Sequence, residues 1–192
     1  MCRSLFLAVS LLTACVMVQA GDISGKVSAG KGPSVVYVEA IPGKTFPPPA
    51  KPLEMDQKSL AFNPHILVAP VGATVEFLNS DKVAHNIFWP AISGNKKLGH
   101  NLGTWPTGEK RPFKFDAPGI APLLCNVHPE MSAYVIVTPT PYYAETDEAG
   151  NFKIADVPDG SYTLTAWHEG FKTQSKPVVV SGGAKADFTL AK

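Results

Sequence analysis

Short apolar segments separated by turn-forming residues are the feature that most constrains this chain. It contains 18 prolines and 16 glycines among its 192 residues. Proline and glycine interrupt helices, whereas β-branched runs bounded by Gly, Pro, Asn and Asp are typical of strands. No window of about eleven residues has the apolar spacing of an amphipathic helix. The pattern therefore predicts an all-β protein.

Two proline-rich stretches divide the chain. Pro47, Pro48, Pro49 and Pro52 form a stiff, extended connector, and residues 138–141 form a second junction. We expect N-terminal strands in residues 21–50, a middle domain at 51–138 and a C-terminal domain at 139–192. The expected strands are 23–27, 35–40, 59–62, 66–69, 74–78, 86–89, 111–115, 121–125, 133–138, 151–154, 161–167, 176–180 and 184–190.

Residues 1–20 have the pattern of a signal peptide. Arg3 supplies a positive charge, residues 5–18 are mostly apolar, and Val18-Gln19-Ala20 is a small-residue cleavage site. A membrane anchor is the alternative, but the apolar run is short for a membrane span. Residues 12–15 also resemble a bacterial lipobox, in which Cys15 would be acylated and would attach the protein to a membrane. We therefore expect a periplasmic or otherwise exported protein, either soluble or a lipoprotein.

The charge balance argues against a nucleic-acid partner. The chain has 17 basic and 16 acidic residues, and the two numbers become equal when Arg3 is removed with the leader. Binding to nucleic acid or to anionic lipid needs an excess of basic residues. We expect neither partner, except for membrane attachment through Cys15.

The number of cysteines points to metal chemistry. Cys2 and Cys15 lie in the leader, so only Cys125 remains in the body of the protein. It has no partner for an intrachain disulfide, although an exported thiol is exposed to oxidation. Such a thiol is usually buried, catalytic or bound to a metal.

The neighbours of Cys125 favour copper. His128 and Met131 follow it at intervals of three residues, and His85 lies about forty residues earlier at the start of another apolar run. Two imidazoles, a thiolate and a weak axial thioether make the ligand set of copper electron-transfer sites. Zinc is the competing metal, since Cys and two His also suit tetrahedral zinc. Zinc has no use for a thioether, so Met131 favours copper.

Residues 59–138 resemble a cupredoxin of the plastocyanin and amicyanin type. The first half of plastocyanin is matched by Ser59-Leu60-Ala61-Phe62, Pro64, Gly72, Val75, Phe77, Asn79 and His85-Asn86-Ile87. The compact loop Cys125-x-x-His128-Pro129-x-Met131 resembles that of amicyanin. The resemblance implies a Greek-key β-sandwich with one type 1 (blue) copper, bound by His85, Cys125, His128 and Met131. It also implies that Asn86 joins the two ligand loops, and that the ring edge of His128 reaches solvent. The connection from residue 89 to residue 109 is longer than in plastocyanin.

The C-terminal segment resembles a second family. Residues 146–192 carry two turn-and-strand patterns, Thr146 to Phe152 and Val157 to Leu164, that resemble the carboxypeptidase regulatory-like, transthyretin-like β-sandwich. Residues 23–27 and 35–38 resemble the opening strands of that family. The copper domain would then be inserted into a second small sandwich. The alternative is a plain N-terminal extension of the cupredoxin.

These features predict an exported protein that carries single electrons between redox partners and is not an enzyme. The main alternative is a periplasmic copper-binding or copper-delivery protein. A copper enzyme would need further copper sites, usually with His-x-His pairs, and the sequence has none. Docking or adhesion through the C-terminal module is another alternative. The similarity to methylamine utilisation-type cupredoxins implies a dehydrogenase as partner, although the sequence names neither donor nor acceptor.

Other polar residues are expected to be structural. His65 is expected at the surface or at a strand edge. His100 lies in a polar loop and His168 at a strand end; either could bind a second metal, but we do not expect it to. The acidic residues Glu145, Asp147 and Glu148 fit a solvated turn better than a calcium site.

Overall fold

A computed structural model of the chain describes residues 19–192. The prediction of a signal peptide and that of acylation at Cys15 depend on residues 1–18, which lie outside the described part. The described residues form seventeen strands and one short 3-10 helix, Lys96–Leu98 (η1), which confirms the all-β prediction. Within residues 19–192, no helix has the length and apolar character needed to cross a membrane.

The middle of the chain forms a two-sheet sandwich, called here the first sandwich. One sheet has the order β4-β3-β6-β9 and the other the order β5-β11-β10-β7-β8. Both sheets include a parallel pair, β3 with β6 and β5 with β11. The strands of the two sheets are Ala61–Asn63 (β4), Leu53–Lys58 (β3), Thr74–Asn79 (β6) and Lys110–Lys114 (β9), and Ile66–Pro70 (β5), Ser132–Thr138 (β11), Gly119–Leu124 (β10), His85–Trp89 (β7) and His100–Trp105 (β8).

Both ends of the described chain contribute to a second sandwich. Its sheets have the orders β12-β2-β14-β15 and β13-β1-β16, with β17 also paired to β1. The strands are Tyr143–Glu145 (β12), Val35–Val38 (β2), Gly160–Trp167 (β14) and Gln174–Val180 (β15), and Asn151–Pro158 (β13), Ala20–Ser28 (β1), Ala184–Lys185 (β16) and Phe188–Thr189 (β17). The N-terminal strands therefore pair with C-terminal strands, while the exact domain boundaries stay a prediction.

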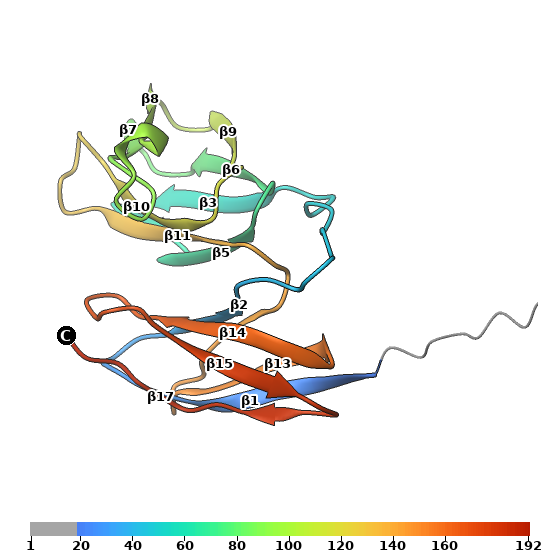
Figure 1. Cartoon of the computed structure of the whole chain (residues 1–192). Helices are drawn as coiled ribbons and strands as arrows, with labels where there is room; N and C mark the ends of the chain where they lie inside the picture. Colours follow the sequence, from blue (N-terminus) through green and yellow to red (C-terminus); the bar gives the residue numbers. More distant parts are fainter. Residues whose placement is uncertain (1–18) are drawn as a thin grey trace, which may run out of the picture.

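Four sheets are stacked in the molecule (Figure 1). One apolar cluster, including Phe77 and Leu123, fills the first sandwich. Another, including Ile23 and Leu164, fills the second. A third cluster joins the two sandwiches, because β5 and β11 face β2 and β14. Its buried members are Val35, Tyr37, Ile66, Val68, Ile136 and Trp167.

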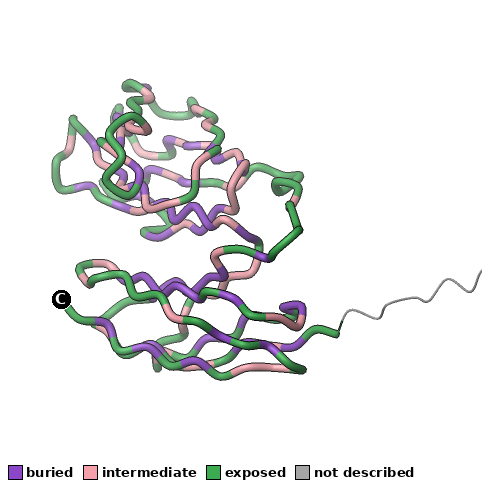
Figure 2. The backbone as a smooth tube through the Cα atoms, in the orientation of Figure 1, coloured by how far each residue is buried: buried purple, intermediate pink, exposed green. Residues whose placement is uncertain are grey.

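The two inner sheets are covered on both faces, and their sequences reflect it. Every residue of β2 is buried, as are the last four residues of both β11 and β14. A strand buried on both faces is continuously apolar rather than alternating. Figure 2 shows the buried segments gathered on the strands that face the junction between the sandwiches.

The structure differs from the expected strands in several places. The segment expected at 59–62 begins with a turn, because Ser59 and Leu60 have φ angles of 56° and 57°, which strands do not adopt. β3 was not expected, because the charged residues that alternate with Met55 and Gln57 hide its buried face. β8 and β12 were also not expected, since they are short or largely exposed.

Candidate metal centre

Three of the four predicted ligands meet at one end of the first sandwich. His85 begins β7, Cys125 follows β10, and His128 lies in the loop before β11. One ligand atom from each residue lies within 4.8 Å of the others. His85 and Cys125 are 0% and 3% exposed, whereas His128 is half-buried. The site is thus closed on the protein side and reaches the surface through His128.

The two histidines turn the same nitrogen inward. Nδ1 of His85 lies 3.0 Å from Nδ1 of His128, and the ring centroids are 4.7 Å apart at an angle of 59°. Nε2 of His85 lies 3.1 Å from a carboxylate oxygen of Asp81. That contact keeps the proton of a neutral ring on Nε2, so the lone pair of Nδ1 is directed at the other donors. This arrangement suits a cation held between the rings.

Backbone amides prepare the sulfur of Cys125 for a negative charge. The N–H groups of Asn86 and His128 point to Sγ from 3.5 Å and 3.4 Å. Cysteine binds metals as the thiolate, and backbone N–H groups are suitable hydrogen-bond donors to a negatively charged ligand atom. One donor comes from β7 and the other from the ligand loop, so the sulfur is held from two sides.

Met131 closes the ligand loop. Its backbone N–H donates to the carbonyl of His128 at 3.0 Å, and its side chain is 1% exposed. Met131 and Cys125 belong to the same buried apolar cluster. The thioether is thus kept out of water on the core side of the loop.

Asn86 joins the strands around the site. Its Oδ1 accepts from the backbone of Asn126 at 3.3 Å. Its Nδ2 donates to the side chain of Asn101 at 2.9 Å and to the carbonyl of Gly103 at 2.8 Å. The buried amide therefore links β7, β8 and the ligand loop, as the resemblance to cupredoxins implied.

Asp81 is a residue that the sequence analysis missed. Its carboxylate accepts from the backbone N–H groups of Leu60 and Lys82, both at 2.8 Å, besides contacting His85. These backbone hydrogen bonds, followed by the contact with His85, lower the pKa of the Asp81 carboxyl to about 2. A carboxylate held in this way orients a ligating imidazole. Its position four residues before His85 was the available signal.

The remaining histidines lie outside this group. His65 contacts Glu169 at 2.7 Å, and His100 packs on Trp89 and Phe113. His168 is buried beside Phe171. Within residues 19–192, His85, Cys125 and His128 form the single cluster of three or more His, Cys, Asp or Glu side chains that could hold a metal ion.

Two family models match the chain. One, described as copper binding proteins of the plastocyanin/azurin family, matches residues 50–138. Residues 50–138 form a copper-binding domain of this family. The second model, the carboxypeptidase regulatory-like domain, matches residues 129–191. The first match covers the first sandwich, and the second match covers β11 of that sandwich together with the C-terminal strands of the second sandwich.

Solved structures are similar to about half of the chain. A purple cupredoxin from Nitrosopumilus maritimus is 26% identical, with a TM-score of 0.41 over 45% of this chain and 99% of that one. A copper-containing nitrite reductase from Thermus scotoductus is also 26% identical, with a TM-score of 0.42 over 52% of this chain and 25% of that one. A Cu(I) amicyanin variant is 21% identical, with a TM-score of 0.41 over 45% and 81%. No curated protein matches the chain by sequence.

Copper is the cofactor of the copper-binding domain, and the residues present fit it. Two inward imidazole nitrogens and a sulfur that accepts two N–H groups converge within 4.8 Å. Thiolate and imidazole donors in this number suit copper, and a buried thioether beside them suits Cu(I). The donor set is therefore that of a type 1 centre.

Proposed function

We propose that the protein carries single electrons between redox proteins outside the cytoplasm. The observation that carries the proposal is the convergence of His85, Cys125 and His128 at one partly exposed end of a rigid sandwich. These three residues would bind copper, with Met131 as a weak fourth ligand. Bound copper supplies a one-electron redox couple.

The protein side of the site favours fixed geometry over ligand exchange. His85 is held by Asp81, and Cys125 by two backbone amides. Ligands that do not move between oxidation states keep the reorganisation of the site small. A copper-delivery site, the alternative function, would need donors that are easier to reach than a fully buried histidine.

Three exposed apolar side chains belong to segments that form or contact the site. Leu60, Val83 and Val127 are 44%, 44% and 46% exposed. Val127 precedes His128, Val83 lies two residues before His85, and the backbone of Leu60 donates to Asp81. We call these three residues the apolar rim. Exposed apolar groups that gather in one place mark interaction sites, so the rim supports electron exchange with another protein through His128.

Export is proposed from the leader pattern and from Cys125. Disulfides are the usual state of cysteines outside the cytoplasm, and Cys125 is a free, buried cysteine in the described residues. Copper ligation would protect its thiol from oxidation. We expect no catalytic turnover, because the sequence lacks the His-x-His pairs of multicopper enzymes.

Voltammetry and copper retention test the function together. The Cu(II) protein should show an intense blue thiolate-to-copper band and a reversible one-electron wave. It should also keep its copper when reduced in the presence of a Cu(I) chelator. A colourless Cu(II) protein would refute the blue site. Rapid loss of copper on reduction would instead favour copper delivery.

A further inference from the structure

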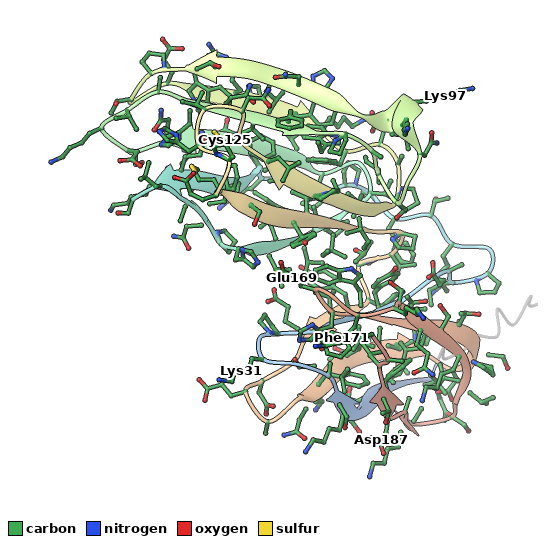
Figure 3. The ribbon with its side chains drawn as sticks, turned by 90° about the vertical axis from the view of Figure 1, so that its left-hand side faces the viewer. Lys31, Lys97, Cys125, Glu169, Phe171 and Asp187 are labelled. Carbon is green, nitrogen blue, oxygen red and sulfur yellow. The ribbon has the colours of Figure 1, made fainter. Side chains whose placement is uncertain are left out.

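The second sandwich reaches the same side of the molecule as the metal centre. Glu169 lies in the loop between β14 and β15, and its carboxylate contacts His65 of the first sandwich at 2.7 Å. Figure 3 looks onto this side and shows Glu169 between Cys125 above and Phe171 and Lys31 below. The loop of Glu169 is therefore part of the face that carries the ligand loop.

Tyr134 connects the loop of Glu169 with the ligand loop. His65, which contacts Glu169, also packs against Tyr134, with the two ring centroids 5.9 Å apart. Tyr134 lies three residues after Met131 on the extended chain that starts β11. Three residues of strand span about 10 Å. Tyr134 is thus about 10 Å from Met131 along the strand, and Glu169 lies beyond it, next to His65.

A protein partner would cover both places. A standard interface covers about 800 Å² on each partner, which corresponds to a patch about 16 Å in radius. A partner that covers the ligand loop and the neighbouring Tyr134 also meets His65 and Glu169, which contact each other beside Tyr134. We propose that the second sandwich supplies part of the surface on which the redox partner docks, an inference that rests on the proposed electron-transfer function.

An apolar interface holds the two sandwiches together. Trp167, 6% exposed, packs on Tyr134 with ring centroids 5.1 Å apart. The cluster between the sandwiches continues through Tyr37 and Ile136. Domains joined by a hydrophobic interface of this kind keep a fixed relative position. The loop of Glu169 is thus a permanent part of the docking face.

The charges of the face define the chemistry of the partner. The apolar rim lies at its centre, and charges of both signs lie beside it. Asp81 and Glu169 contact His85 and His65, and the side chains of Lys82 and Glu130 are exposed. The partner that fits is a redox protein with an apolar, weakly charged surface around its own redox centre. Its association should depend little on ionic strength, since no block of one charge steers it.

Electron self-exchange between copies of the full-length copper protein tests this inference. Each copy presents the same face, so one copy serves as the redox partner of the other. We expect Glu169→Lys to slow exchange between Cu(I) and Cu(II) copies about tenfold at low salt. The introduced lysines of two docked copies would repel each other. Salt should restore the rate, because charges are screened beyond about 10 Å at 0.1 M. A slow rate that salt does not restore would indicate structural damage and would overturn the inference from this variant.

Asp116→Lys is the matched control. Asp116 is 66% exposed and pairs with Lys114. It follows Phe115, whose carbonyl binds Gly72 at the copper-distal end of the first sandwich. The same change of charge there should leave self-exchange unchanged. Equal rates for Glu169→Lys, Asp116→Lys and the unmodified protein at low salt would place the second sandwich outside the docking surface.

A second measurement is independent of electron transfer. Amide NMR shifts of the diamagnetic Cu(I) protein should change with its concentration around Val127 and around residues 169–171 together. Changes confined to the first sandwich would overturn the inference. Failure of the proposed function would look different: the unmodified protein would exchange electrons neither with itself nor with small outer-sphere oxidants.

Discussion

The carboxylate of Asp81 lies 3.1 Å from Nε2 of His85, while Nδ1 of the same ring lies 3.0 Å from Nδ1 of His128. One edge of the buried imidazole thus contacts a fixed negative charge, and the Nδ1 edge points to the metal position. The pair connects a surface loop to the interior of the site. It makes Asp81 the residue outside the ligand set whose removal should affect the metal most.

Asp81→Asn should weaken copper binding by about 10–100-fold, the usual effect of losing a group that orients a ligand. Removing a negative charge near the metal should also raise the reduction potential, because the charge favours Cu(II) over Cu(I). Chelator competition and voltammetry measure the two effects. Asp116→Asn, on the exposed far end, is the control. Unchanged affinity and potential in Asp81→Asn would show that packing alone orients His85.

Asp81 should also make stability depend on pH. The pKa of its carboxyl falls from 3.8 to about 2 in the folded protein. A carboxyl with a lowered pKa stabilises the fold fully above its unfolded pKa, and the stabilisation is lost as pH falls through the folded value. Urea unfolding of the metal-free protein should therefore show a difference between wild type and Asp81→Asn above about pH 4 that shrinks toward pH 2. A difference that stays constant over this range would contradict the assignment.

Cys125→Ser should abolish the blue absorption band, because the band needs a thiolate bound to Cu(II). Met131→Leu should keep the band and shift the potential, since it removes only a weak axial ligand. His100→Ala, which changes a histidine outside the cluster, should leave the spectrum unchanged. A blue Cys125→Ser protein would rule out this cysteine as the ligand.

Asn86→Ala should loosen the ligand loop. It removes the acceptor for Asn126 and leaves Gly103 and Asn101 without their buried donor. Asn101, Gly103 and Asn126 are exposed, so water can replace the lost partner, and each lost hydrogen bond should cost about 0.5–1.5 kcal/mol. Copper should dissociate faster. Thermal melts and chelator kinetics measure these effects. In Asn95→Ala, which removes an exposed hydrogen bond to Lys97, copper release should stay normal. Equal release from both variants would mean that Asn86 does not hold the loop.

Trp167→Ala should destabilise both sandwiches together. The buried indole joins their facing sheets, and removing a buried Trp costs about 3–5 kcal/mol. Calorimetry should show one transition at a lower temperature. Val179→Ala, at a side chain that is 66% exposed, should change stability by less than about 0.5 kcal/mol. Two separate transitions in the wild-type protein would contradict a shared core.

The sequence predicted the parts of the site that are local and missed those that depend on distant contacts. Cys125, His128 and Met131 share one short loop, so their spacing alone indicated a metal. His85 was chosen from its position at the start of another apolar run, and the resemblance to cupredoxins supports the same choice. The role of Asp81 depends on its contacts with His85, in the same segment, and with Leu60, in another segment. The residue pattern within one segment does not reveal contacts with another segment.

The fold shows the same division. Turn residues and short apolar runs predicted the all-β class. The cluster between the sandwiches was not predicted, although the four consecutive apolar residues of β2 carry its signal. Such a run is equally compatible with a strand buried in one sandwich. Only the structure shows that the other sandwich, through Ile136 and Val68, covers the second face of β2.

The pairing of β1 sets the order in which the molecule can assemble. Ile23 pairs with Ile154 on one side and with Ala184 on the other, so its sheet needs strands from near the end of the described chain. Pairings of such long range are slow, because loop closure must be achieved before contacts compensate it. The first sandwich draws on contiguous strands and can form earlier. During synthesis β1 is therefore made before the strands that pair with it, and its edges stay unpaired until β13, β16 and β17 have been synthesised.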